Sequence, residues 1–358
     1  MSILFILLLF IIFGAIGYSS YKSFYIPFKI NKLASIINTD QVEHAIRALL
    51  KLLKMDENNI LARWYIAIGY QNMSQYILAI KEFNTLLKIG RYNKEERQID
   101  IRKNLAHLYN QTNNYPKMIA EYISISRLDP GDFESNFNLG FYYYRNNNYS
   151  LAMDCIKKAQ AVQPQNPEVN YILGELYFQK SDFANAEEKF SITLASVPGH
   201  SKAHFRLGII LYHRKEYQKA KEEIQSLSNN SELKNEVHYW LGKIYYDIGE
   251  FETAMGHFEK AVKMIRDNSD KPALEIRYLL ASMYKHNNRL TEAMEQWQLI
   301  HRASASYLDV DDNISHYQKL LSNQYLKLFS EADDSSFRTV CQKIINSLED
   351  TIEHIEKV

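Results

Sequence analysis

Two histidines, His200 and His204, stand four residues apart, the spacing of two metal ligands on one face of a helix. Pro198 and Gly199 come directly before them and indicate a turn between helices. We therefore expect His200 to lie outside the helix and the pair not to hold a metal. The motifs HExxH and GxSxG, a phosphate-binding loop and a dinucleotide-binding glycine loop are all absent from the sequence.

The other residues with chemical potential form no predicted site. Cys155 and Cys341 are the only cysteines, and their separation fits neither a zinc site nor a disulfide framework. The acidic segment from Asp309 to Asn313 lacks the glycine and the distal glutamate of a calcium loop, so we interpret it as a helix cap. The sequence predicts no catalytic residue, no metal site and no cofactor. An enzyme is the least favoured class of protein.

The composition favours a helical protein without an affinity for nucleic acid. Lys and Arg number 42, as do Asp and Glu, so no basic field would attract a polyanion. Glycine (12) and proline (7) are scarce among 358 residues, which favours helices over turns and sheets. Tyrosine is abundant, with 26 residues, and its apolar ring and polar tip suit contact surfaces.

An uncharged apolar run extends from Ile3 to Tyr18. It is slightly shorter than the ~20 residues that cross a bilayer, and the next residues can extend it through the interface. We predict that residues 1–21 form a transmembrane anchor. A cleaved signal peptide is the alternative, because Ala15 and Gly17 offer a small-x-small cleavage pattern.

The flanks of this run predict its orientation. Lys22, Lys29 and Lys32 follow it, and no lysine or arginine precedes it. The positive-inside rule therefore places the body of a single-pass inner-membrane protein in the cytoplasm, and the periplasmic side is the alternative.

Small residues recur every 34 residues in the rest of the chain. The series are Gly140, Gly174, Gly208 and Gly242; Ala152, Ala186, Ala220 and Ala254; Ile156, Phe190, Ile224 and Phe258; and Pro130, Pro164 and Pro198. A period of this length indicates a stack of identical supersecondary units.

The pattern resembles the tetratricopeptide repeat (TPR), in which small and large apolar residues alternate at these positions. The best copy, residues 167–200, carries Leu173, Gly174, Tyr177, Ala186, Phe190 and Pro198. The resemblance implies an all-α fold, a right-handed α-solenoid of about eight TPR helix pairs. Each unit would be two antiparallel helices joined by a turn such as residues 145–148.

The repeats define the expected domains. A juxtamembrane segment and a degenerate first repeat occupy residues 22–59, with Ala45 in register. The solenoid extends over residues 60–307, with short insertions near residues 92–98 and 268–273. A C-terminal helical cap follows at residues 308–358.

Aromatic residues recur at first-helix positions that the TPR motif does not fix, which in this family line the concave side. They are Phe137, Phe141, Tyr144, Tyr171, Phe178, Phe205, Tyr212, Tyr239, Tyr246 and Tyr278. We predict that they bind a peptide or helix of a partner protein, because aromatic residues dominate interface energetics. Alternatively, the rings pack against neighbouring first helices, or the C-terminus of the chain itself fills the groove.

The C-terminal cap is predicted as two helices. Asp311 or Asp312 caps the first, which extends to about Phe329. Apolar residues from Phe337 to Ile355 then follow steps of three and four. This second helix either covers the last repeat or associates with a second copy or a partner.

An anchor followed by repeats is similar to the lipopolysaccharide assembly regulator family and, in architecture, to repeat proteins of spirochaete flagellar collars. The rubredoxin-type metal module of the former family needs four cysteines, and this tail has only Cys341. We expect a membrane-anchored protein-interaction scaffold in assembly or regulation of an envelope complex. A periplasm-facing component of an envelope or flagellar-motor assembly is the alternative.

Overall fold

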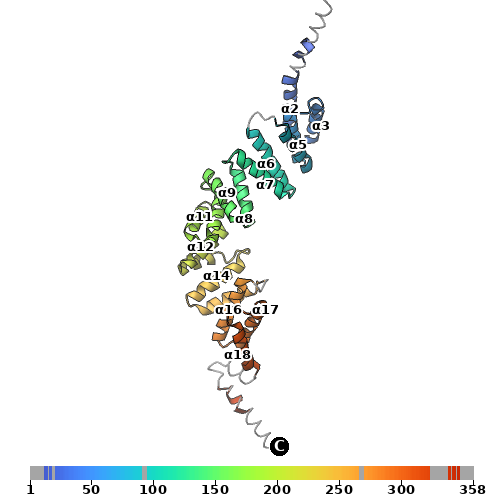
Figure 1. The fold of residues 1–358 in the computed structure, drawn as a ribbon. Helices are drawn as coiled ribbons and strands as arrows, with labels where there is room; N and C mark the ends of the chain where they lie inside the picture. Colours follow the sequence, from blue (N-terminus) through green and yellow to red (C-terminus); the bar gives the residue numbers. More distant parts are fainter. Residues whose placement is uncertain are drawn as a thin grey trace, which may run out of the picture. The chain divides into compact units, whose positions relative to one another are not determined.

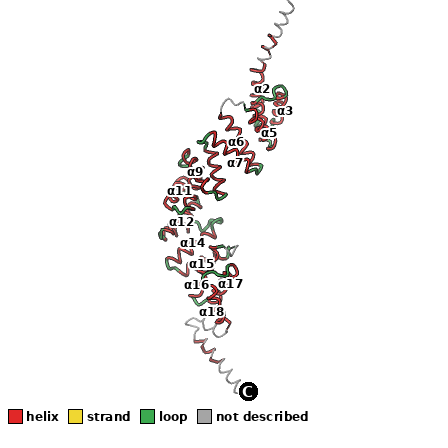
Figure 2. Tube along the Cα trace, viewed as in Figure 1, coloured by secondary structure: helices red, strands yellow, loops and turns green. Residues whose placement is uncertain are grey.

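The computed structural model describes residues 12–14, 16–17, 21–90, 95–265, 270–322, 338–339, 341–343 and 345–346. All elements in these ranges are helices joined by short turns, and no strand occurs in them (Figure 2). Most of the predicted anchor, residues 1–21, lies outside the described residues. No helix in the described part of the chain is long and apolar enough to cross a membrane.

The chain divides into two compact units, Met1–Ser181 and Asp182–Val358. The first unit contains the π-helical turn η1 (Tyr21–Tyr25) and helices α2 (Ile26–Ala34), α3 (Val42–Leu53), α4 (Ile60–Asn72), α5 (Tyr76–Ile89), α6 (Glu95–Gln111), α7 (Tyr115–Leu128), α8 (Phe133–Arg145), α9 (Tyr149–Val162) and α10 (Pro167–Gln179). Within this unit, consecutive helices form antiparallel pairs, from α2 with α3 to α8 with α9 (Figure 1).

The second unit continues the same order. It contains α11 (Phe183–Ser196), α12 (Ser201–His213), α13 (Tyr217–Gln225), α14 (Lys234–Asp247), α15 (Phe251–Val262), α16 (Lys271–His286), α17 (Leu290–Ala303) and α18 (Val310–Ser322). Here α12 pairs with α13, α14 with α15 and α16 with α17. First helices of neighbouring pairs also touch, as α8 and α10 do in the first unit and α12 and α14 in the second. The helices fall in the predicted register of eight repeats.

One turn geometry joins the helices of most pairs. After α8, Asn147 adopts a left-handed conformation with φ 58°, and the Asn148 backbone N–H donates to the Tyr143 carbonyl oxygen at 2.9 Å. This bond closes the open end of the helix and reverses the chain. The left-handed position recurs at Ser74, Asn113, Ser181, Lys215, Gly249 and Asn288.

Glycine brings the two helices of a pair into contact. A Cβ atom on Gly140 would lie 2.4 Å from Ile156 Cγ1, and one on Gly208 would lie 2.5 Å from Ile224 Cγ1. Both isoleucine side chains are completely buried. Such distances leave no room for a side chain, which explains the spacing of 16 residues between the small residue and the large one.

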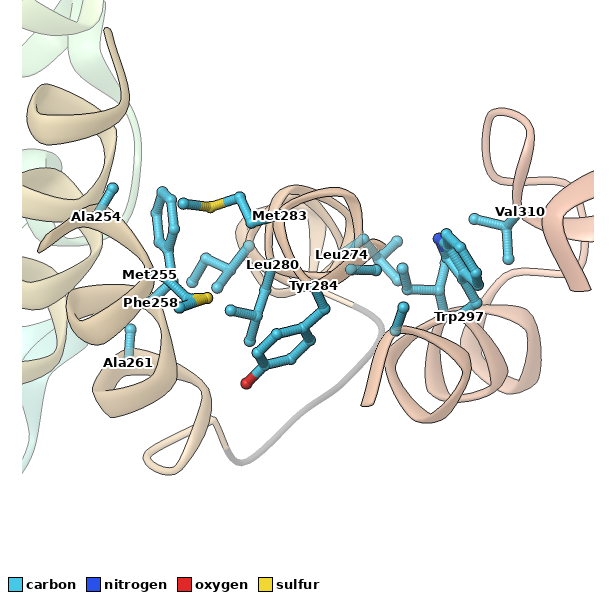
Figure 3. Close-up of a cluster of buried hydrophobic side chains, with 14 residues drawn as sticks. Ala254, Met255, Phe258, Ala261, Leu274, Leu280, Met283, Tyr284, Trp297 and Val310 are labelled. Carbon is cyan, nitrogen blue, oxygen red and sulfur yellow. The ribbon is translucent and has the colours of Figure 1, made fainter. Parts of the chain in front are cut away.

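The core lies between successive pairs. Figure 3 shows it for α15 to α18: Phe258 and Met255 of α15 lie against α16, and Trp297 of α17 lies beside Val310 of α18. The tryptophan ring, 1% exposed, stacks on Tyr317 of α18 with centroids 5.6 Å apart. The first helix after the last repeat therefore covers that repeat.

Two boundaries differ from the prediction. Helix α18 begins at Val310, so Asp311 and Asp312 lie in its first turn rather than at its cap. The residues before the repeats at 99–132 and 274–307 do not form loops throughout. Helices α6 and α16 begin at Glu95 and Lys271 and have 17 and 16 residues, against 13 for α8. Part of each insertion is an additional turn of the first helix. The predicted seam from Phe337 to Ile355 lies largely outside the described residues.

Candidate protein-interaction site

Three phenylalanine rings form an ordered stack along α8. The rings of Phe133 and Phe137 have centroids 5.8 Å apart and planes 8° apart, and those of Phe137 and Phe141 are 6.3 Å and 11° apart. The Arg145 guanidinium lies 5.8 Å above the ring of Phe141. Residues four apart share one face of a helix, so this stack is a continuous apolar strip. Phe141 is 40% exposed and is its most accessible ring.

The next first helix of this unit contributes an acidic partner. The Tyr144 hydroxyl donates to Glu175 Oε2 of α10 at 3.2 Å. Glu175 is only 2% exposed, and a buried carboxylate requires hydrogen bonds to offset its lost hydration. The ring of Tyr144 therefore also joins two repeats.

Lys243 is the centre of an aromatic cluster in the second unit. Its ammonium lies 5.7 Å from the ring centroid of Tyr212 and 5.4 Å from those of Tyr239 and Trp240. It also donates to Glu275 Oε1 of α16 at 2.8 Å. A cation over several ring faces is stabilised by their quadrupoles and remains partly accessible to a ligand.

Tyrosine hydroxyls of this unit bond to carboxylates of the following repeat. Tyr212 donates to Asp247 Oδ2 at 2.6 Å, and Tyr239 donates to Glu275 Oε2 at 2.8 Å. Tyr278 donates to Asp309 Oδ1 at 2.8 Å.

These bonds have electrostatic consequences. Burial and the bond to Asp309 raise the pKa of Tyr278 to about 12. Burial alone would raise the pKa of Glu275, but hydrogen bonds from Lys243 and Tyr239 lower it overall. Near neutral pH the phenols thus keep their protons and the carboxylates their charges.

The ten predicted rings differ in exposure. Eight are half-buried: Phe137, Tyr144, Tyr171, Phe178, Tyr212, Tyr239, Tyr246 and Tyr278. Phe141 is exposed, whereas Phe205 is only 6% exposed. The prediction that Phe205 presents its ring on an open surface is wrong, because neighbouring side chains cover it. Binding of a partner by the other rings stays a prediction.

The sequence interpretation missed Trp240 and Glu275. Trp240 follows Tyr239 at a position that is not one of the usual concave ones, and Glu275 lies near the start of a long first helix. The alternative interpretation, packing against neighbouring first helices, is confirmed for Tyr212 and Tyr239 through their hydroxyl bonds. These rings are therefore held in fixed positions.

A polar pair links the two helices of many repeats on another face. Its members are always 19 residues apart: Arg63 with Glu82 at 2.6 Å, Arg102 with Glu121 at 2.6 Å, His204 with Glu223 at 2.7 Å, His238 with His257 at 3.1 Å and Arg277 with Gln296 at 2.6 Å. The first position of each pair is the one at which the TPR motif usually has tryptophan. A polar pair thus replaces an apolar contact there.

His204 serves this pair and does not bind a metal with His200. His200 caps the start of α12, and its Nδ1 accepts from the Ala203 backbone N–H at 3.1 Å. His204 has two acceptors, Glu223 and the Pro198 carbonyl oxygen at 2.9 Å from Nε2. Burial alone would lower its pKa, but these acceptors raise it, so His204 favours the imidazolium form. In the described part of the chain, no group of three or more His, Cys, Asp or Glu side chains is placed to hold a metal.

The next repeat places two histidines together. His238 Nδ1 lies 3.1 Å from His257 Nδ1, and the ring of Tyr245 stacks on His257 at 5.4 Å. One ring must donate to the other, so the pair is stable only while it is not doubly protonated. Burial lowers the pKa of His257 to about 4, with His238 and Lys260 adding to the effect.

The geometry defines a class of protein: a helical-repeat protein with ordered aromatic rings on its first helices. Models of the tetratricopeptide repeat match residues 137–192, 173–228 and 236–268. These matches and the helix pairs support the tetratricopeptide-repeat family for this chain, and the fold is an all-α helical repeat of that kind. TPR proteins mediate protein–protein interactions.

Several solved structures are similar to the chain at low identity. The C-terminal part of a TPR repeat-containing protein from Cytophaga hutchinsonii is 17% identical, with 80% of this chain and 99% of that chain covered and a TM-score of 0.44. For pilF of Pseudomonas aeruginosa the values are 16%, 63%, 98% and 0.49. For YrrB, described as a TPR protein with an unusual peptide-binding site, they are 16%, 56%, 98% and 0.43. The family assignment does not depend on these likenesses. Among curated proteins no sequence matches.

Proposed function

We propose that the chain is a scaffold that binds partner proteins through the aromatic rings of its first helices. The observation that carries the proposal is the strip Phe133, Phe137 and Phe141, together with the cluster around Lys243 in the second unit. These rings are held by stacking and hydrogen bonds, so a ligand would lose little entropy in ordering them. Aromatic residues held in this way are typical hot spots, worth ~2 kcal/mol or more.

The test compares two exposed apolar side chains of one repeat. Phe141 lies on the first helix and is 40% exposed, whereas Leu151 lies on the second helix and is 43% exposed. Partners are recovered by crosslinking and pull-down from membranes that contain the wild type, Phe141→Ala or Leu151→Ala. We expect Phe141→Ala to reduce recovery about 10-fold or more, as loss of a hot spot does, and Leu151→Ala to have no effect. Normal recovery by a folded Phe141→Ala variant would refute the proposal.

We further propose that residues 1–21 anchor the protein in the inner membrane. The uncharged run from Ile3 to Tyr18 supports this. So does the segment after it, where Phe24 is 77% and Phe28 is 68% exposed. Exposed aromatic side chains suit the headgroup region. Carbonate washing of membranes and N-terminal sequencing test the anchor, and a soluble product that begins near Tyr18 would contradict it.

The body of the protein then faces the cytoplasm, where it recruits partners in assembly or regulation of an envelope complex. Lys22, Lys29 and Lys32 support this orientation through the positive-inside rule. Protease added to intact spheroplasts should leave the repeats uncut. Digestion from outside would favour the periplasmic alternative, a component of an envelope or flagellar-motor assembly. The proposed role includes no catalysis, because the residues assigned to contacts and turns above leave no nucleophile beside a base.

A further inference from the structure

A small hollow opens between the turn that joins α14 to α15 and the C-terminal half of α16. Its volume is about 280 Å³, and its walls are Tyr246, Phe251, Ser282, Met283, His286 and Asn287. The rings of Tyr246 and Phe251 meet edge to face at 5.5 Å. Phe251 is 53% exposed and the adjacent Ile248 is 38% exposed, so an apolar surface continues out of the hollow.

The rim of the hollow is acidic. The segment from Asp247 to Glu252 also contains Glu250, and all three carboxylate residues are exposed. Asp247 accepts from the Tyr212 hydroxyl, and Glu252 Oε1 accepts from Asn287 Nδ2 at 3.1 Å. Both donors are neutral. No lysine or arginine in the described ranges forms a salt bridge with these carboxylates, whereas most other acidic residues on the first helices of this unit have a cation or a tyrosine.

We propose that this hollow anchors the partner, by taking one large apolar side chain of a segment that carries lysine or arginine beside it. The inference rests on the proposed function and names the chemistry of the partner. An apolar cavity of about 150 Å³ holds a benzene molecule, so 280 Å³ accommodates one phenylalanine, leucine or tryptophan side chain. The exposed carboxylates attract a basic segment and align it over the hollow.

The charge also argues against an occupant from the chain itself. Residues 331–358 contain seven acidic residues and three basic ones. This tail would meet three carboxylates at the rim, and like charges at an interface are unfavourable. A separate basic partner has the opposite balance.

The experiment is a selection of random 12-residue peptides displayed on phage, with the full-length chain as target. We expect the selected peptides to share one Trp, Phe or Leu with at least two Lys or Arg within four positions. The dissociation constant of the best peptide is then measured by fluorescence anisotropy. Ser282→Trp, which fills the hollow, should weaken binding at least 10-fold. Ser150→Trp, on the exposed side of α9, is the matched control and should leave the dissociation constant unchanged.

Charge and folding are tested separately. The double variant Glu250→Lys, Glu252→Lys should weaken binding at low salt and less at high salt, because exposed charges are screened. Circular dichroism reports whether each variant folds. If Ser282→Trp does not fold, Phe251→Ser replaces it, since that side chain is already half-exposed. Selected peptides without a basic residue or an apolar anchor would overturn the proposal. So would normal binding by a folded Ser282→Trp variant, or binding of a synthetic peptide of residues 331–358 in this hollow.

The two proposals fail in different ways. Loss of partner recovery with Phe141→Ala but not with Ser282→Trp would overturn the hollow as an anchor and leave the aromatic strip in place. Loss with Ser282→Trp alone would support the hollow and refute the strip as a binding surface.

Discussion

Gly242→Ala should destabilise the second unit although alanine is the better helix former. A Cβ atom on Gly242 would lie 2.5 Å from Phe258 Cε1, 2.6 Å from Cδ1 and 3.1 Å from Cγ. Favourable contacts between carbon atoms are ~3.5–4.0 Å, so the ring or the whole of α15 must move by about 1 Å. Phe258 is completely buried in the cluster of Figure 3, and its neighbours resist this movement.

The size of the effect follows from two opposed terms. Alanine in place of glycine inside a helix stabilises by about 1 kcal/mol. Overpacking of a well-packed core costs about 1–3 kcal/mol, and contact with three ring atoms favours the upper end. The net loss is therefore about 2 kcal/mol, which lowers the melting temperature of a unit of this size by roughly 4–8 °C.

The assay is thermal and urea unfolding of the purified chain, followed by circular dichroism. Gly256→Ala is the matched control, because it lies in α15 and has no heavy atom within 4 Å of the added Cβ. It should stabilise the protein by about 0.5–1 kcal/mol. Phe258→Leu should remove most of the penalty of Gly242→Ala in a double-mutant cycle. Equal stabilisation by both alanines would refute the close contact, and so would a cycle without coupling.

Four further predictions concern single contacts, each checked by urea unfolding unless stated. Because the pKa of His257 is lowered to about 4, the unfolded chain binds more protons, and stability should fall from pH 6.5 to 4 by about 1–2 kcal/mol after allowance for solvent screening; His257→Gln should flatten this fall. His204 has a raised pKa, so its contribution is full below pH 6.5 and lost as pH rises; His204→Asn, the residue that donates to the same turn carbonyl in the two preceding repeats, should remove this dependence. Tyr239→Phe should cost about 1 kcal/mol through loss of a bond to a charged acceptor, and an unchanged midpoint would contradict that bond. Tyr317→Ala should cost about 1 kcal/mol and shift the fluorescence of Trp297 to the red, whereas an unshifted spectrum would mean that α18 does not cover this ring.

The repeat could be predicted from the sequence because its causes are local and periodic. Gly140 and Ile156 belong to one helix pair, and the turn at Asn147 requires only a residue that tolerates a left-handed backbone. The same constraint recurs wherever a pair must close, so a period of 34 residues is visible in one sequence. Nearest-neighbour stacking then leaves little choice of fold.

The candidate site could be predicted only in part. The positions of the aromatic residues follow from the repeat, but their exposure does not, as the buried Phe205 shows. The motif places no constraint on the residue that each ring meets in the next repeat. For the same reason the helix starts at Glu95 and Lys271 were not visible in the periodicity.

The sequence by itself determined the class of fold, the register of the helix pairs and the identity of the apolar residues between them. The tertiary structure alone decided the bonds from Tyr212 to Asp247 and from Tyr239 to Glu275, and the convergence of three rings on Lys243. These contacts join residues of different repeats at positions that carry no common pattern. Their partners are selected by the packing of one first helix against the next, and that packing depends on the size and charge of each individual side chain.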